Sequence, residues 1–127
     1  FGSMSQERRL HPRAVVRLPA QLGRGKDSWE ESLLFDLSAA GAAVHTHEAL
    51  PLQSEVRLRF RMPLGEDGEP IELTVTTLVV RTGPPEQAAQ HYSHVAGLHF
   101  LDLRGEAFDR LRAHVWAMVD QQATEHA

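Results

Sequence analysis

The feature that most constrains the fold is a segment in which apolar and basic residues alternate one by one, from position 55 to position 62. The apolar residues are Val56, Leu58, Phe60 and Met62, and the basic residues between them are Arg57, Arg59 and Arg61. A period of two residues places successive side chains on opposite faces of an extended chain. The segment therefore predicts a β-strand with one buried face and one face in solvent, and the buried face needs other elements to cover it.

Shorter alternating stretches, separated by turn-forming residues, recur along most of the chain. We expect further strands at 14–22, 29–37, 42–47, 71–81 and 94–101, with a polar hairpin loop at 63–70. The core face of the second stretch is expected to consist of Leu33, Phe35 and Leu37. In 71–81 the apolar period slips from Val75 to Leu78, which predicts a bulge near Thr76-Thr77.

The last part of the chain changes its period from two residues to three and four. The residues that recur at this spacing are Phe108, Leu111, Val115, Met118 and Val119. They form one face of an α-helix that we expect from near Gly105 to near Gln122. Six or seven short strands followed by one amphipathic helix predict a mainly β protein, an antiparallel barrel with the helix docked on it.

Composition limits the classes of protein that remain. The 127 residues suit a single domain, and the absence of cysteine excludes disulfides and thiol catalysis. No run approaches 18 apolar residues, so we predict no membrane span, and the polar N-terminus without a secretion signal predicts a cytoplasmic protein. We expect an expression-tag remnant at 1–3, a flexible basic segment at 4–13, the folded domain at 14–122 and a tail at 123–127.

Charge is concentrated at the N-terminus. Residues 1–26 hold six basic residues and one acidic residue, a net charge of +5, whereas residues 27–127 carry a net charge of −9. A basic segment on an acidic body indicates a local anion site or a solvated arm. The net charge of −4 for the whole chain argues against bulk nucleic-acid binding.

Three arginines lie within six residues of this basic segment: Arg8, Arg9 and Arg13. Guanidinium groups hold phosphates through paired hydrogen bonds and stack on flat rings. Pro12 stiffens the same loop and lowers the entropy that it loses on binding.

A second polar segment, Asp36-Leu37-Ser38-Ala39-Ala40-Gly41, interrupts the predicted strands. A carboxylate such as that of Asp36 accepts hydrogen bonds from the N1–H and amino groups of guanine. Ser38 adds a small donor and acceptor, and Gly41 permits a positive φ and a close approach of the backbone to a ligand. Because one strand-turn-strand unit separates the two segments, they can meet at one end of a barrel and form a site for an anionic purine nucleotide.

The two segments, read as Arg9-x-x-x-Arg13 and Asp36-x-Ser38-x-x-Gly41, resemble the PilZ domain, a bacterial receptor for cyclic di-GMP. The later strands of that family are similar to Val79-Val80-Arg81 and Gly97-Leu98-His99-Phe100, and the resemblance covers roughly residues 7–120. It implies a six-stranded antiparallel split barrel, a C-terminal helix and an N-terminal loop that folds over the ligand.

The resemblance also implies roles for single residues. Arg9 and Arg13 would hold phosphate and guanine, while the turn residues Asp36, Ser38 and Gly41 would shape the base and ribose side. Arg8 matches an additional arginine that the family associates with a stacked pair of ligands. The implied protein is a signalling receptor or adaptor, with cyclic di-GMP as its ligand, no other cofactor and an unidentified downstream protein as its partner.

Other kinds of site have weaker support in the sequence. The scattered histidines are expected to be surface imidazoles, because zinc needs three or four converging ligands. The arginine row of 55–62 could follow a nucleic-acid backbone, but it is more typical of the wet face of an edge strand, and an aromatic stacking platform is missing. No Gly-x-Ser-x-Gly elbow or activated nucleophile is present, so we predict no catalytic residue. A PilZ-like protein–protein adaptor that does not bind nucleotide stays open as the alternative.

Overall fold

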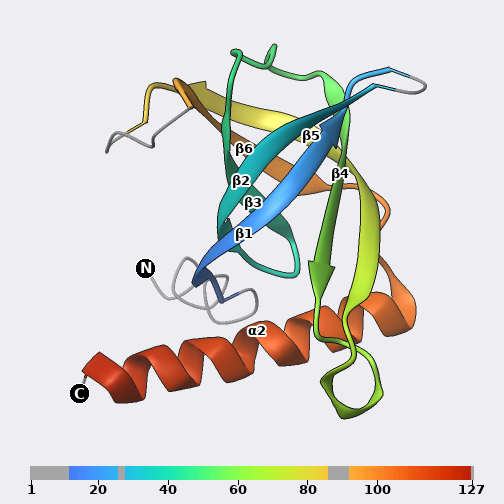
Figure 1. The fold of residues 1–127 in the computed structure, drawn as a ribbon, viewed down its shortest axis with the longest axis vertical. Coiled ribbons are helices and arrows are strands. Elements are labelled where there is room, and N and C mark those ends of the chain that lie inside the picture. Colours follow the sequence, from blue (N-terminus) through green and yellow to red (C-terminus); the bar gives the residue numbers. More distant parts are fainter. Residues whose placement is uncertain (1–11, 26–27, 86–91, 127) are drawn as a thin grey trace, which may run out of the picture.

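The computed structural model describes residues 12–25, 28–85 and 92–126 (Figure 1). The elements in these ranges are β1 (Ala14–Gly23), β2 (Trp29–Leu37), β3 (Gly41–Thr46), β4 (Glu55–Met62), the 3-10 turn η1 (Glu66–Gly68), β5 (Ile71–Gly83), β6 (His94–Phe100) and the helix α2 (Gly105–His126). The strands pair antiparallel and close a barrel in the order β1-β2-β3-β6-β5-β4. The predicted six-stranded antiparallel barrel with one C-terminal helix is confirmed.

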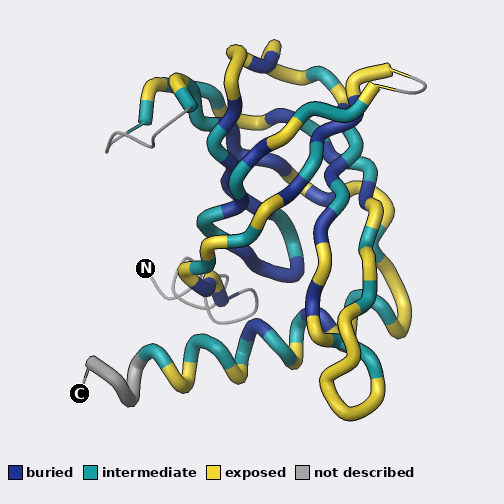
Figure 2. Tube along the Cα trace, in the orientation of Figure 1, coloured by how far each residue is buried: buried dark blue, intermediate teal, exposed yellow. Residues whose placement is uncertain are grey.

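Inward side chains of the strands form the core of the barrel, and Figure 2 shows the buried segments along the strands. Helix α2 lies across one end of the barrel (Figure 1). The four apolar residues of β4 are at most 4 % exposed, as their alternation predicted. Leu111 and Val115 of α2 are fully buried in the same core. Burial of one such side chain contributes about 1.5–3 kcal/mol, so these two residues fix the N-terminal half of the helix. The helix continues past Gln122 to His126.

The predicted core face of β2 is wrong for two of its three residues. Leu37 is buried as expected, but Ser32 and Leu34 face inward, whereas Leu33 and Phe35 are half-buried on the outer face. The physical reason is a shift of the β2–β3 register between Leu34 and Asp36. One extra residue at this bulge reverses which side chains face the core on its two sides.

The bulge predicted near Thr76-Thr77 is also wrong. Pairing of β5 with β4 runs without interruption through these residues, and Thr77 is fully buried. Its hydroxyl donates to the Val56 carbonyl oxygen at 2.8 Å, so a polar residue keeps the inward alternation without an unpaired group. The register shift lies between Val79 and Arg81, where β5 pairs with β6, and it leaves Val80 50 % exposed.

Strands β1 and β4 close the barrel along only part of their length. Their pairing runs from Ala20 opposite Phe60 to Gly23 opposite Arg57, whereas β1 pairs with β2 from Ala14 onward. Pro19, directly before the closed part, has no N–H to donate. Among the described strands, none covers this edge of the first half of β1, and α2 packs against β1 instead (Figure 1).

None of the described helical segments has the length and apolar character that a membrane crossing demands.

Candidate functional site

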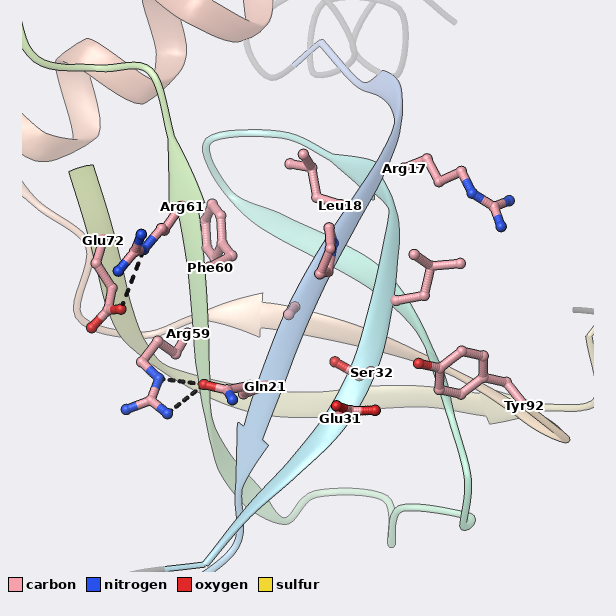
Figure 3. A pocket seen from close by; sticks show the side chains of 13 residues that line it. Arg17, Leu18, Gln21, Glu31, Ser32, Arg59, Phe60, Arg61, Glu72 and Tyr92 are labelled. Carbon is pink, nitrogen blue, oxygen red and sulfur yellow. Dashed lines mark hydrogen bonds and ion pairs between the residues drawn. The ribbon is translucent and has the colours of Figure 1, made fainter. Parts of the chain in front are cut away.

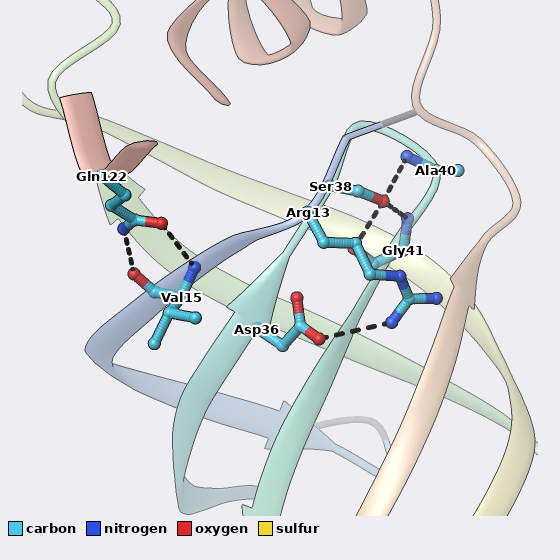
Figure 4. A network of polar contacts seen from close by, with 7 residues as sticks. All are labelled: Arg13, Val15, Asp36, Ser38, Ala40, Gly41 and Gln122. Carbon is cyan, nitrogen blue, oxygen red and sulfur yellow. Dashed lines mark hydrogen bonds and ion pairs between the residues drawn. The ribbon is translucent and has the colours of Figure 1, made fainter. Parts of the chain in front are cut away.

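The turn between β2 and β3 is held together by the side chain of Ser38 (Figure 4). The Ser38 hydroxyl oxygen accepts the N–H groups of Ala40 and Gly41, both at 3.1 Å, and the hydroxyl donates to the Gly41 carbonyl oxygen at 3.3 Å. The Ser38 N–H donates to the same carbonyl oxygen at 2.9 Å. Ser38 is buried, and its hydrogen-bonding capacity is used inside the turn, so it shapes the turn and does not reach outward to a ligand.

Gly41 is required in this turn for a different reason from the one first expected. Its φ is not in the left-handed region, so the predicted positive φ is wrong. The backbone of β3 instead lies so close to β6 that a Cβ atom on Gly41 would be 2.3 Å from the Leu98 carbonyl oxygen. Real Cβ contacts are never that short, and glycine is therefore needed for the close approach of two strands. The close approach that we observe is to β6, whereas the sequence led us to expect one to a ligand.

Arg13 and Asp36 come together at the start of this turn, as the spacing of the two segments predicted. The Arg13 Nη1 lies 3.4 Å from the Asp36 Oδ2, and their side chains are 64 % and 28 % exposed (Figure 4). An exposed pair of this length contributes about 0–1 kcal/mol to stability. The guanidinium is therefore positioned beside the carboxylate but is free to turn toward an anion. Arg8 and Arg9 lie outside the described residues.

The strand pairing extends this site across the outer face of the barrel. Asp36 is opposite Ala43, Ala43 is opposite Gly97, and Gly97 is opposite Arg81, so the four residues form one row across β2, β3, β6 and β5. The centre of the row has almost no side chain, and the Arg81 side chain lies over it. A Cβ atom on Gly97 would be 3.3 Å from the Arg81 Cβ and 3.5 Å from its Nε. A flat floor is thus flanked by Arg13 and Asp36 on one side and by Arg81 on the other.

Sequence reasoning missed this use of Arg81. The residue entered the prediction only as part of a strand that resembles the family, and its position over Gly97 depends on the register shift at Val80. A signal was present, because Gly97 in a buried strand indicates the close approach of another group.

Flat rings continue the outer face beside Asp36. The ring centroids of Phe35 and His45 are 4.3 Å apart, those of His45 and Tyr92 are 6.2 Å apart, and those of His47 and Tyr92 are 4.6 Å apart. Burial, and then the charge of Arg17, lower the pKa of His45 below its ordinary value of 6.5, so its imidazole is neutral at pH 7. The His45 Nδ1 is buried and has no hydrogen-bond partner within the described residues.

Metal binding has no geometric support in the part of the chain that the structure describes. Within residues 12–25, 28–85 and 92–126, no three side chains of His, Asp or Glu gather as metal ligands would.

A hollow of about 870 Å³ lies at the partly open seam between β1 and β4 (Figure 3). Its lining includes Arg17, Gln21, Ser32, Phe60 and Tyr92, but none of the predicted site residues. The arginines of β4 that border it are engaged with neighbouring groups. Arg59 donates to the Gln21 Oε1, and the Arg61 Nε lies 3.7 Å from the Glu72 Oε2.

The arginine row of β4 is not the wet face of an edge strand, so that part of the prediction is wrong. β4 pairs with β5 along its whole length and with β1 over part of it. The guanidiniums of Arg57 and Arg59 lie 4.8 and 4.0 Å from the centroid of the Trp29 ring. Arg57 and Arg59 therefore pack against Trp29 in cation–π contacts, whereas Arg61 is exposed and pairs with Glu72.

The chain is thus a small closed β-barrel domain that carries an arginine beside an Asp-x-Ser-x-x-Gly turn. A family model described as the PilZ domain matches residues 7–116. The chain belongs to the PilZ domain family.

Solved structures share the fold at low sequence identity. One is the inhibitor of motility MotI/DgrA from Bacillus subtilis, with a TM-score of 0.69 and 18 % identity over 92 % of this chain and 52 % of that chain. Another is the PilZ domain of YcgR from Escherichia coli with c-di-GMP, with a TM-score of 0.66 and 13 % identity over 94 % of this chain and 97 % of that chain. A tetrameric PilZ domain from Xanthomonas campestris gives a TM-score of 0.65 and 13 % identity over 96 % and 97 % of the two chains.

The chain spans about half the length of the MotI/DgrA chain that it matches. No curated protein sequence matches it.

Proposed function

We propose that the protein is a cyclic di-GMP receptor and adaptor module. The observation that carries the proposal is the position of Arg13, 3.4 Å from Asp36 at the head of the turn that Ser38 and Gly41 hold. Membership of the PilZ family supports it, as does the fold shared with a YcgR domain described with c-di-GMP. The site offers a cation for phosphate and a carboxylate for the N–H donors of guanine, which is the chemistry that this ligand needs.

The proposed role of each residue follows from whether its side chain is exposed and whether its hydrogen-bonding groups are already engaged. Arg13 is mostly exposed and can turn from Asp36 to a phosphate, leaving the Asp36 carboxylate to accept hydrogen bonds from guanine. Ser38 and Gly41 keep the turn in shape, since the Ser38 hydroxyl is already engaged and Gly41 has no room for a side chain. Arg9 is proposed to join Arg13 in holding phosphate and guanine.

We propose that the outer face also holds a second, stacked nucleotide. Two stacked molecules of cyclic di-GMP bring four phosphates together, and such clustered negative charge needs several cations nearby. Arg8 is proposed to supply one of them, and Arg81, at the other end of the row, to supply another after it swings away from Gly97. We therefore expect two nucleotides per chain at saturating ligand, and a ratio closer to one for Arg8→Ala.

Ligand binding is proposed to clamp the N-terminal arginine loop on the barrel and so to create or hide a surface for a downstream protein. The proposed protein works in the bacterial cytoplasm as a binding module and not as an enzyme. The alternative is an adaptor of the same fold that does not bind nucleotide.

Competition against a fluorescently labelled cyclic di-GMP tests the proposal. Loss of a charge-assisted, paired contact costs about 2–4 kcal/mol, so Arg13→Ala should weaken binding about 30- to 1,000-fold. Arg61→Ala is the matched control, because Arg61 is exposed, pairs with Glu72 and lies on β4 away from the turn. Equal affinity of Arg13→Ala and the unaltered chain would exclude this site, and no binding by the unaltered chain would favour the nucleotide-independent adaptor.

A further inference from the structure

Helix α2 and strand β1 are joined by two hydrogen bonds between one side chain and the backbone of one residue (Figure 4). The Gln122 Nε2 donates to the Val15 carbonyl oxygen at 2.8 Å, and the Val15 N–H donates to the Gln122 Oε1 at 3.4 Å. β4 does not pair with β1 at this position. The carboxamide therefore takes the place of a neighbouring strand and satisfies backbone groups on the open edge of β1.

Val15 is also the residue of β1 that connects directly to the candidate site. It follows Arg13 by two positions and pairs with Asp36 in the β1–β2 ladder. The register of this ladder shifts between Val15 and Leu18. Ala14 and Val15 therefore form a short paired segment with β2 that is separate from the continuous pairing that begins at Leu18. The start of β1 is thus held by a short piece of ladder on one edge and by Gln122 on the other.

The two halves of α2 differ in how firmly they are held. The N-terminal half carries the fully buried Leu111 and Val115, whereas Met118 and Val119 are only partly buried against the core. Segments with few buried apolar contacts open at lower free energy than the core does. The C-terminal part of α2 is therefore the part whose docking can change, and Gln122 is its polar contact with the start of β1.

We propose that Gln122 is a positioning residue for the nucleotide site and that occupancy of the site in turn fixes the C-terminal part of α2. This inference rests on the proposed function. Gln122 holds the Val15 backbone, which sets where Arg13 leaves the barrel and how it meets Asp36. Because coupling between two sites is reciprocal, a contact that favours binding must itself be favoured by the bound ligand. The C-terminal part of α2 then presents the bound state to a partner protein.

Two variants of Gln122 and two controls test this role. Gln122→Ala removes both hydrogen bonds, and Gln122→Glu keeps the size but replaces the donor with a carboxylate oxygen facing the Val15 carbonyl. Gln121→Ala is the matched control, since it changes the same residue type at the next, exposed position of the helix. Thr77→Val removes a buried hydrogen bond in β5 and controls for a general loss of stability.

The first measurement is the affinity for cyclic di-GMP at a temperature where all variants are folded. Gln122→Ala and Gln122→Glu should bind at least about 5-fold more weakly than the unaltered chain, the lower end of ordinary coupling between sites. Gln121→Ala and Thr77→Val should bind as the unaltered chain does. The second measurement is amide hydrogen exchange of residues 117–121, which cyclic di-GMP should slow in the unaltered chain but not in Gln122→Ala.

Each contrary result has a separate meaning. Unchanged affinity of Gln122→Ala would overturn the positioning role and leave the proposed function standing. Equal weakening in Thr77→Val would assign the effect to stability and would also overturn it. Absence of binding by the unaltered chain would overturn the proposed function, and the coupling with it.

Discussion

Replacing Gly41 by alanine should destabilise the barrel through a clash between β3 and β6. The new Cβ would lie 2.3 Å from the Leu98 carbonyl oxygen, and ordinary contact begins at 3.4 Å, so the strands must separate by roughly 1 Å. The same junction holds the hydrogen bond from the Phe100 N–H to the Ala40 carbonyl oxygen at 2.9 Å.

The expected cost follows from these two effects. Overpacking of this kind costs about 1–3 kcal/mol, and a weakened hydrogen bond adds about 1 kcal/mol, which together give about 2–4 kcal/mol. Urea unfolding followed by circular dichroism measures this loss. Gly83→Ala is the control, because a Cβ at Gly83 meets nothing within 4 Å and its φ is not left-handed; its stability should change by less than about 1 kcal/mol.

A third variant separates the clash from a backbone requirement. Asparagine tolerates left-handed φ better than alanine does, so a left-handed glycine would make Gly41→Asn the milder change. The clash predicts that Gly41→Asn is at least as unstable as Gly41→Ala. A Gly41→Ala protein as stable as the unaltered chain, or a clearly milder Gly41→Asn, would refute the reasoning.

Other perturbations test the core, the outer face and the site. Thr77→Val should lower the free energy of unfolding by about 1–2 kcal/mol in urea titrations, because it removes the buried hydrogen bond from the Thr77 hydroxyl to the Val56 carbonyl oxygen; an unchanged midpoint would contradict this. The lowered pKa of His45 means that the unfolded chain binds more protons near pH 6.5. Its contribution to stability is therefore complete above that pH and is lost as the pH falls below it. His45→Gln should flatten the rise in unfolding free energy between pH 5 and pH 7, and a slope equal to that of the unaltered chain would count against the assignment. Arg13→Ala should melt within a few degrees of the unaltered chain, since its exposed ion pair contributes little to stability; early melting would make Arg13 a structural residue.

Alternation predicted the strands best where it was unbroken. In β4 every second residue is apolar, and all four of these residues are buried. In β2 an extra residue at Phe35 reversed the inward face, which a period count cannot anticipate because the bulge arises from pairing with β3. In β5 the inward Thr77 was counted as polar, although its hydroxyl finds a partner on β4.

In the candidate site, too, some features were predictable from the sequence and others required the strand pairing. The spacing of the motifs predicted that Arg13 and Asp36 meet, since one hairpin connects their segments. Gly97 indicated the close approach of some group, but the identity of that group as Arg81 requires the register of β5 against β6. Glycine is likewise required at position 41 because β3 and β6 lie close together there, and not because of the φ angle of Gly41.

Calorimetric titration of the unaltered chain with cyclic di-GMP tests the central claim most directly, because it returns affinity and stoichiometry together. We expect saturable binding that approaches two nucleotides per chain and weakens as salt rises, since the proposed contacts are largely between charges. Saturation at one nucleotide would reject the stacked pair and keep the receptor. A titration without heat of binding, at a concentration and temperature where competition with the labelled nucleotide also finds no complex, would contradict the claim that this barrel is a cyclic di-GMP receptor.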